Sequence, residues 1–313
     1  MAGCVLFSGK TPPLKIAAIV PSYGRDGSLL KTLAQISRLE PPPNELWVML
    51  QGERPSPRIQ EMCSSLPATV RLQTTVFPSA QAVRNLAAQR TQADILLFLD
   101  DDVDPESDLI RAHLENFRDP SVHAVAGFYL EPGEHETREH RKTFWWRPLT
   151  SLEKCPASFA ERVNSPLWPS CNGSIRREVF LKLGGFDENY RYTLLDDTDL
   201  AVRMQKAGYR CVHDPKARLF HRKEPTGGNR PIKPGDKVIA SREKWYTWFY
   251  FFWMNYGVLG LGEILSRMRT NVFRRPYFQR PDLLLLALRE MTVGLGQAVR
   301  SVVQGRRLMR EDD

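Results

Sequence analysis

The chain has 313 residues, of which 42% are hydrophobic and 26% are charged, enough for one large globular domain or one domain plus an appendage. Its five cysteines are scattered and form no C-x-x-C pair, which argues against a disulfide framework and against a zinc knuckle. The N-terminus lacks the basic and apolar regions of a secretory signal, so we expect a protein of the reducing cytoplasm.

The net charge of +8 is unevenly distributed along the chain. Residues 1–220 hold 27 Lys and Arg against 27 Asp and Glu, whereas residues 221–313 hold 17 against 9. The excess positive charge therefore lies entirely in the last third. No RNA-binding signature accompanies these basic residues, so we expect no nucleic-acid partner.

Apolar runs alternate with amphipathic segments along the first hundred residues. The pattern predicts helices at 28–39, 57–65 and 79–90, and buried strands at 15–20, 46–50, 70–75 and 95–99. Such alternation indicates right-handed crossovers and a mostly parallel sheet covered on both faces. The predicted fold class is α/β, with ligands expected beyond the carboxyl ends of the strands.

The fourth predicted strand leads directly into an acidic cluster, L-D-D-D-V-D-P, at 99–105. Carboxylates this close repel one another, so a divalent cation that holds a phosphate is the simplest reason for the cluster. Asp100 and Asp102 share one face of an extended strand end. The alternative is that the acids only solubilise a turn before a helix that Pro105 starts.

A second group of chain features follows in residues 121–207. A strand is predicted at 121–130, an irregular loop or lid at 131–166, a turn at 171–174 and a helix at 176–183. After the glycine pair at 184–185, three acids in four positions open a helix: Asp196, Asp197 and Asp199. A capping box from Thr193 to Asp196 explains one acid, whereas three make a catalytic carboxylate the better interpretation.

Residues 245–262 form an uncharged stretch with nine aromatic residues between Trp245 and Tyr256. Aromatic side chains beside basic ones suit an anionic membrane surface, which is the interpretation we favour. A packing or dimer face is the second interpretation, and a true membrane span is the third.

Several motifs occur in order along residues 15–222. They are V-P-S-Y-G-R, A-V-R-N, F-L-D-D-D-V-D-P, C-N-G-S-I-R-R-E-V-F, G-G-F-D-E, L-D-D-T-D-L-A-V-R-M and the segment from His213 to His221. Each is weak alone, but the ordered set is specific. The chain resembles the inverting nucleotide-sugar glycosyltransferases of family 2, which have the GT-A fold.

The resemblance implies a role for each matching residue. Asp197, the second acid of the pair, would be the general base, and Asp196, the first, would also belong to the catalytic site. Asp102, Asp100 and His221 would hold Mn²⁺ or Mg²⁺. The residues implied in nucleotide-sugar binding are Pro21, Tyr23, Arg25, Gln51, Arg84, Asn85, Asp100 and Asp101. Those implied on the acceptor side are Asn172, Gly173, Gly185, Phe186 and Asp187.

The resemblance also divides the chain into a GT-A domain at 1–223 and a basic, aromatic-rich helical region at 224–313. Within the domain, 15–130 is the nucleotide-sugar half and 131–223 the acceptor half. Two positions differ from the usual family pattern. Asp196-Asp197 replaces a Glu-Asp pair, and Gln51 follows the second strand where relatives often carry an Asp that contacts uracil. A glutamine amide can also pair with a base.

The resulting hypothesis is a metal-dependent transfer of a sugar from a nucleoside diphosphate to a hydroxyl acceptor, in polysaccharide or glycolipid assembly. A glycan or lipid-linked acceptor, peripheral membrane contact through 240–310 at the inner face of the membrane, and a homodimer are expected with it. Two alternatives stay open: a phosphohydrolase of the haloacid dehalogenase type, and a non-catalytic carbohydrate-binding or scaffold protein with the same fold.

Overall fold

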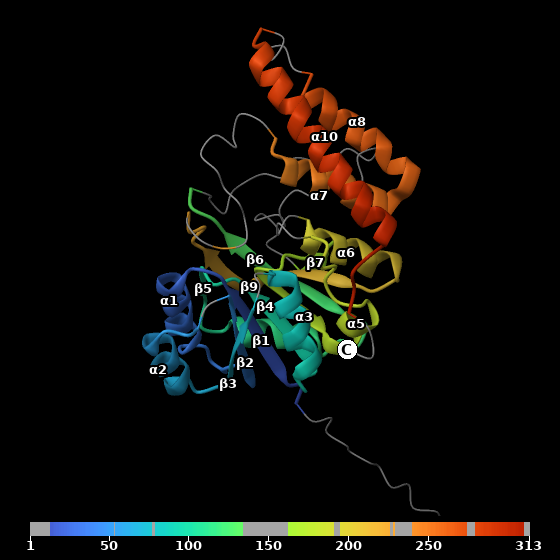
Figure 1. The fold of residues 1–313 in the computed structure, drawn as a ribbon. Helices are drawn as coiled ribbons and strands as arrows, with labels where there is room; N and C mark the ends of the chain where they lie inside the picture. The colour runs from blue at the N-terminus through green and yellow to red at the C-terminus, as the bar shows by residue number, and fades with distance from the viewer. Residues whose placement is uncertain are drawn as a thin grey trace, which may run out of the picture.

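The computed structural model describes residues 13–52, 54–76, 79–133, 162–190, 195–225, 228, 240–273 and 279–309. Within these ranges, strands form one mixed sheet in the order β3-β2-β1-β4-β8-β6-β9-β5, with β7 paired to β9. Helices cover both faces of the sheet, and further C-terminal helices extend beyond it (Figure 1). The predicted α/β class is confirmed.

The first half of the sheet is parallel, as the sequence predicts. It contains β1 (Ile16–Ser22), β2 (Glu45–Gln51), β3 (Thr69–Thr75) and β4 (Ile95–Leu99), connected through α1 (Asp26–Ile36), α2 (Pro57–Ser65) and α3 (Ala80–Arg90). Both β1 and β4 are buried along their whole length, which explains their nearly continuous apolar sequences. Their carboxyl ends meet at one edge.

The second half of the sheet is mixed. β8 (Asn172–Arg176) lies between β4 and β6 (Ala124–Leu130) and is antiparallel to both. β9 (Cys211–His221) runs parallel to β6, and β5 (Val103–Pro105) and β7 (Val163–Asn164) pair antiparallel with β9. α4 (Leu109–Asn116) begins four residues after Pro105, because Pro105 belongs to β5.

The predicted turn at 171–174 is wrong, because Asn172 begins a buried strand. The amide of Asn172 donates to the carbonyls of Phe128 and Ala217, both at 2.8 Å, and its oxygen lies 3.0 Å from Nε2 of His113. A Cβ on Gly173 would lie 2.3 Å from the carbonyl oxygen of Pro169. This strand therefore contains small residues because neighbouring chain segments approach it closely.

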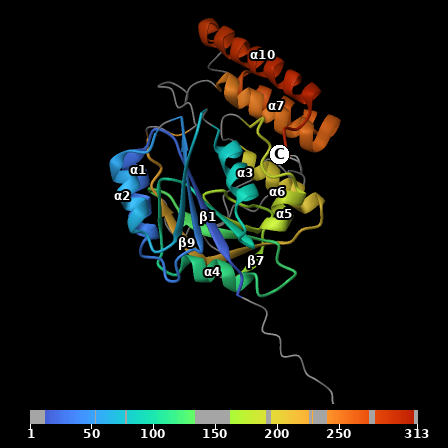
Figure 2. The same cartoon turned by 60° about the horizontal axis from the view of Figure 1, so that its bottom comes forward.

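Alternate residues of the strands face two separate cores. Ile16, Ala18 and Val20 belong to the core beneath α1, α2 and α4. Ala17 and Ile19 belong to the core beneath α3, α5 (Arg177–Lys182) and α6 (Asp196–Lys206). The sheet therefore separates two helical layers, and α3 and α6 share one layer (Figure 2).

The aromatic stretch forms α7 (Arg242–Tyr256), which η1 (Gly257–Gly260), α8 (Leu261–Asn271) and α10 (Pro281–Gln304) follow. Tyr246, Tyr250, Phe251 and Phe252 are buried in a core shared with Tyr190 and Val202. The second of the three interpretations, a packing face, therefore explains these buried side chains. The membrane-surface interpretation stays a prediction, and it applies to exposed residues of the stretch such as Val258 and Leu259. Apolar aromatic content is the same in both cases, so composition could not separate them.

Figure 2 shows α7 and α10 side by side, above the layer that holds α6. None of the helices in the described ranges combines the length and the apolarity that a bilayer crossing demands. Of the predicted loop at 131–166, residues 134–161 lie outside the described part of the chain.

Candidate functional site

A pocket opens at the carboxyl ends of β1, β2 and β4, where the sequence places it. Residues from both predicted halves of the site line it: Pro21, Tyr23, Arg25, Gln51, Ala80, Arg84, Asp100, Asp101, Asp102, Ser170, Leu195, Asp196, Asp197, His221, Lys223, Glu224, Pro225 and Gly228. The acidic cluster and the acids of α6 thus share one cavity although about ninety-five residues separate them.

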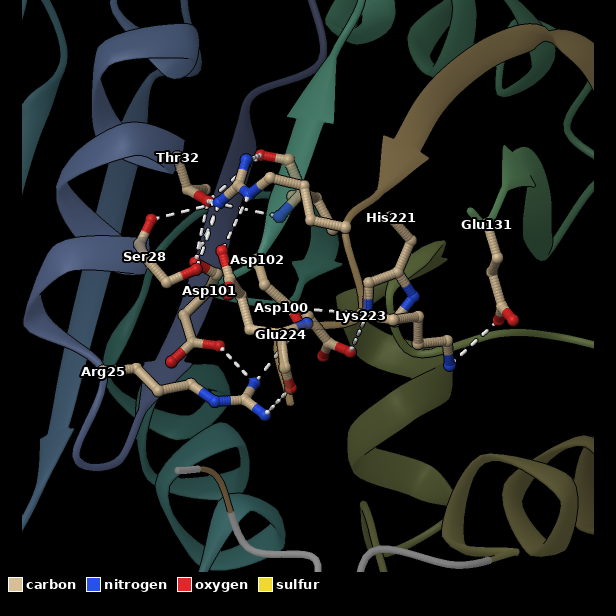
Figure 3. A network of polar contacts seen from close by, with 12 residues as sticks. Arg25, Ser28, Thr32, Asp100, Asp101, Asp102, Glu131, His221, Lys223 and Glu224 are labelled. Carbon is tan, nitrogen blue, oxygen red and sulfur yellow. Dashed lines mark hydrogen bonds and ion pairs between the residues drawn. The ribbon is translucent and has the colours of Figure 1, made fainter. Parts of the chain in front are cut away.

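Asp101 is a buried acid of the cluster that contacts the end of β1 and Arg25. Its carboxylate accepts from Ser22 Oγ at 2.6 Å and from Nη1 of Arg25 at 3.2 Å. Burial raises the pKa of Asp101 to about 6, although the hydrogen bond from Ser22 and the charge of Arg25 oppose the rise. Asp101 therefore anchors the loop and Arg25 at the pocket wall (Figure 3).

Asp102 and His221 form the centre of the polar cluster. His221 Nε2 lies 3.0 Å from Oδ1 of Asp102 and 3.6 Å from Oδ2 of Asp100. Burial alone would raise the pKa of Asp102. Three neighbours outweigh burial and hold this pKa at about 2: His221 through its hydrogen bond and charge, Arg25 through its charge, and Glu224 through its backbone N–H. Asp102 is therefore ionised at neutral pH.

Asp100, Asp102 and His221 fit a divalent cation by their chemistry. Each offers one ligand atom, and these atoms all lie within 4.8 Å of one another. Two carboxylate oxygens and an imidazole nitrogen are ligands that Mn²⁺ accepts. Figure 3 shows the His221 ring directed at the two carboxylates from the end of β9. This is the predicted ligand set.

Arg84 connects the two halves of the pocket. Its guanidinium lies 2.8 Å from Asp100 and 3.7 Å from Asp196, and its side chain is almost fully buried. Gln81, one turn earlier on α3, donates from Nε2 to Asp196 at 2.9 Å. One helix therefore positions an acid from each half.

The two adjacent acids of α6 differ in environment. Asp196 is buried against Gln81 and Arg84, whereas Asp197 is half-exposed at the pocket wall and its Oδ1 accepts from the backbone N–H of Thr198 at 2.7 Å. Leu195 precedes them with a φ of 63°, a rare backbone value for leucine. The predicted capping box includes Thr193, which lies outside the described residues.

Other predicted site residues lie outside the pocket lining. Asn172 and Gly173 belong to the buried strand β8. Asn85 makes a reciprocal pair with the backbone of Phe186, donating to its carbonyl and accepting from its N–H, both at 2.9 Å. Gly185 packs against Asn85, and Asp187 is fully buried. Their implied roles stay predictions, and the contacts that they make are structural.

The structure adds pocket residues that sequence reasoning missed, including Gln81 behind Asp196 and Ser170, Lys223 and Glu224 in the lining. Lys223 has a φ of 55°, and its ammonium lies 2.9 Å from Glu131. Glu224 donates its backbone N–H to Asp102 at 3.0 Å. For Lys223 and Glu224, the sequence signal of a place in the pocket was their position shortly after His221.

Curated relatives match the chain over part of its length. Hyaluronan synthase of Streptococcus pyogenes is 28% identical over 192 residues, 56% of this chain and 43% of the synthase. The O-antigen biosynthesis protein RfbC of Myxococcus xanthus is 31% identical over 154 residues, 45% of this chain and 12% of that protein. The chain therefore aligns with less than half the length of these relatives.

Solved structures share the fold at low sequence identity. The mannosyltransferase PcManGT of Pyrobaculum calidifontis, in complex with GDP-Man and Mn²⁺, is 16% identical with a TM-score of 0.52 over 94% of this chain and 77% of its own. GalNAc-T7 with UDP, GalNAc and Mn²⁺ is 12% identical with a TM-score of 0.60 over 93% of this chain and 57% of its own.

The family model described as "Glycosyltransferase like family 2" matches residues 12–246, most of the chain and the whole of the pocket. This match and the arrangement of the sheet leave the phosphohydrolase alternative without support. The chain belongs to glycosyltransferase family 2 and has the GT-A fold.

Proposed function

We propose that this protein transfers a sugar from a nucleoside-diphosphate donor to a hydroxyl acceptor with inversion, and that the reaction depends on a divalent cation. The observation that carries the proposal is one shared pocket. In it, the candidate ligands Asp100, Asp102 and His221 stand with Asp197, a half-exposed carboxylate. An acid cluster for the donor and a separate base for the acceptor are the two parts that a single displacement needs.

In this mechanism the residues have distinct tasks. Asp197 takes the proton of the acceptor hydroxyl while the oxygen attacks the anomeric carbon, and the nucleoside diphosphate leaves from the opposite side. A cation held by Asp100, Asp102 and His221 would neutralise charge on the leaving diphosphate. Arg25 at the pocket wall adds positive charge near the same groups. No covalent intermediate forms, so a single displacement inverts the anomeric centre.

Asp197 is favoured over Asp196 as the base because the two side chains have different partners. Asp196 is buried and bound by Gln81 and Arg84, so an acceptor hydroxyl reaches it poorly. Both acids line the cavity, but Asp197 is the half-exposed one. On the donor side, Tyr23 and Gln51 line the part of the pocket at the ends of β1 and β2. We place the nucleotide's heterocyclic base there.

The proposed acceptor is a glycan or a lipid-linked sugar at a membrane surface. The names of three similar proteins support this class of acceptor. Two are the hyaluronan synthase and the O-antigen protein. The third is an N-acetylglucosaminyl-diphospho-decaprenol L-rhamnosyltransferase of Mycobacterium tuberculosis, 40% identical over 57 residues, which is 18% of each chain. Exposed aliphatic residues on η1, α8 and α10 also support it, including Leu259, Leu265 and Leu285. The exposed Arg269, Arg289 and Arg300 on the same helices suit anionic lipid.

Vesicle flotation tests the membrane contact. We expect the wild-type protein to float with vesicles of phosphatidylglycerol and not with those of phosphatidylcholine. Leu259→Asp combined with Leu285→Asp should abolish flotation, and Val76→Asp, which alters an exposed apolar residue outside the C-terminal helices, should not. Equal flotation of all three proteins contradicts the contact, and loss of a dimer in the double variant assigns the face to a second copy.

Donor binding tests the proposed reaction at its metal site. Thermal stability is measured with UDP, GDP, dTDP, CDP and ADP, each with and without Mn²⁺. We expect one diphosphate to raise the melting temperature only with Mn²⁺, because ligand binding to the folded state stabilises it. Asp102→Asn should remove the shift, and Asp104→Asn, in the same cluster but outside the ligand set, should keep it. No shift with any diphosphate overturns the proposal and favours a scaffold protein.

A further inference from the structure

The end of the chain after α10 returns to the catalytic domain and pairs with the segment that follows α5. The backbone N–H of Met309 donates to the carbonyl of Gly184 at 2.9 Å, and that of Glu188 donates to the carbonyl of Arg307, also at 2.9 Å. The N–H of Arg307 donates to Asp187 at 3.0 Å. Residues 305–309, which we call the C-terminal tail, thus add a layer of contacts to the G-G-F-D-E motif.

The tail packs closely against the two glycines of this motif, where a side chain would leave no room. Gly184 and Gly185 have φ values of 74° and 67°. A Cβ on Gly184 would lie 2.9 Å from Leu308 Cβ, and one on Gly185 would lie 2.5 Å from both Asn85 Oδ1 and Met309 Cε. The motif is therefore enclosed between α3 on one side and the tail on the other. Its glycines are explained by this packing.

Arg306 of the tail enters a buried polar network beneath α6. Its Nη1 lies 2.6 Å from Asp199 and 3.3 Å from Asp187, and the side chains of both acids are fully buried. Nη2 donates to the side-chain oxygen of Asn255 at 3.0 Å and to the carbonyl of Met254 at 3.3 Å. Arg306 therefore joins α6, α7 and the G-G-F-D-E motif at one point.

The network fixes the first turn of α6 through Asp199. Arg203 contacts the second oxygen of Asp199 at 2.8 Å, and Tyr190 and Asn255 donate to the first at 3.1 and 2.8 Å. Two guanidiniums thus balance two buried carboxylates, Asp187 and Asp199. Asp199 lies only two residues after Asp197, so a shift of this turn moves the proposed base.

We propose that Arg306 is a positioning residue for sugar transfer, because its pairing with Asp199 and Asp187 holds the first turn of α6, and with it the Asp197 carboxylate, at the pocket. This inference rests on the proposed function. It makes the C-terminal tail part of the acceptor side of the site. Donor binding depends on Asp100, Asp102 and His221, which the tail does not contact, and is independent of Arg306.

The test compares Arg306→Met, Arg306→Lys and Arg307→Met in the full-length protein. Arg307 is the matched control, because its side chain is mostly exposed and pairs with Glu188 at the surface. For Arg306→Met we expect kcat of transfer to fall about 10- to 100-fold, as a misplaced catalytic group causes, with the Kd of the nucleotide–Mn²⁺ pair unchanged within about twofold. Arg306→Lys should recover part of kcat, and Arg307→Met should match the wild type.

Circular dichroism and melting temperature separate positioning from folding. If Arg306→Met does not fold, the folded Arg306→Lys protein decides, and a kcat equal to that of the wild type overturns the inference. A lower melting temperature with unchanged kcat also overturns it, since the role is then purely structural. Absence of transfer by the wild-type protein contradicts the proposed function itself, whereas normal transfer by a folded Arg306→Met contradicts only this inference.

Discussion

The two ends of the pocket are built in different ways. The donor end consists of residues at the ends of strands. Asp100 and Asp102 follow the buried strand β4, and His221 is the last residue of β9. The acceptor end consists of the first turn of α6, which Gln81, Arg84 and Arg306 hold through side chains that come from distant parts of the chain. Backbone topology thus specifies the donor end, and long-range polar contacts specify the acceptor end.

Metal removal should have the largest effect and should separate the two ends most sharply. Chelation with EDTA is expected to lower transfer by about 1,000-fold, which corresponds to about 4 kcal/mol of lost transition-state stabilisation. Mn²⁺ should restore it. His221→Ala should raise the Mn²⁺ concentration that gives half-maximal rate by at least about tenfold. Full activity after chelation would show that the cluster has another role.

Arg84→Met breaks the contact between the two ends. It leaves Asp196 buried without its cation and Asp100 without its closest partner, so we expect the free energy of unfolding to fall by about 3 kcal/mol. Both donor affinity and transfer rate should also fall. Chemical denaturation, calorimetry and initial rates measure these quantities. Arg90→Met, on the same helix but exposed, is the control and should alter none of them.

His113 stabilises β8, the strand that connects the parallel half of the sheet to the mixed half. Its ring lies 2.8 Å from Ser174 Oγ and 3.0 Å from Asn172 Oδ1, both on β8. Burial lowers the pKa of His113 to about 4, although its hydrogen bond to the side-chain oxygen of Asn172 opposes this shift. The unfolded chain therefore takes up a proton below about pH 6.5 and the folded protein does not. Stability should therefore fall as the pH decreases from about 6.5 to about 4.

The expected loss from His113 between pH 7 and pH 5 is about 2 kcal/mol. Denaturation with urea at both pH values measures it, with His113→Gln as the comparison because a glutamine amide does not titrate. The His113→Gln variant should have a lower free energy of unfolding than the wild type at pH 7. Between pH 7 and pH 5 its free energy of unfolding should fall by about 2 kcal/mol less than that of the wild type. An equal loss in both proteins would place the pH dependence elsewhere.

Gln81→Leu should have the smallest effect. It removes one hydrogen bond to the buried Asp196 but leaves Arg84 in place, so we expect the free energy of unfolding to fall by about 1–2 kcal/mol. The transfer rate should fall modestly, and donor affinity should stay unchanged. Calorimetry and initial rates test the difference, and a lost donor affinity would show that the two ends are less separate than their contacts indicate.

Sequence reasoning succeeded where the chain is locally regular. The runs at 15–20 and 95–99 predicted β1 and β4, and the acids after β4 predicted the cluster, because burial and repulsion act on neighbouring residues. The strand β8 was missed because Asn172, Gly173 and Ser174 resemble a turn until their distant partners are known. No local pattern distinguishes Gln81 or Arg306 from ordinary surface residues of a helix or a tail.

The most direct test of the account is the behaviour of Asp197→Asn beside Asp196→Asn and the wild type. Sugar transfer and the Kd of the nucleotide–Mn²⁺ pair are measured on the same preparations. We expect Asp197→Asn to bind the donor nucleotide normally and to lose transfer by about 1,000-fold or more, because the proton acceptor is gone while the donor end is intact. Transfer by Asp197→Asn at the wild-type rate would contradict the assignment of the base and the division of the pocket into two ends.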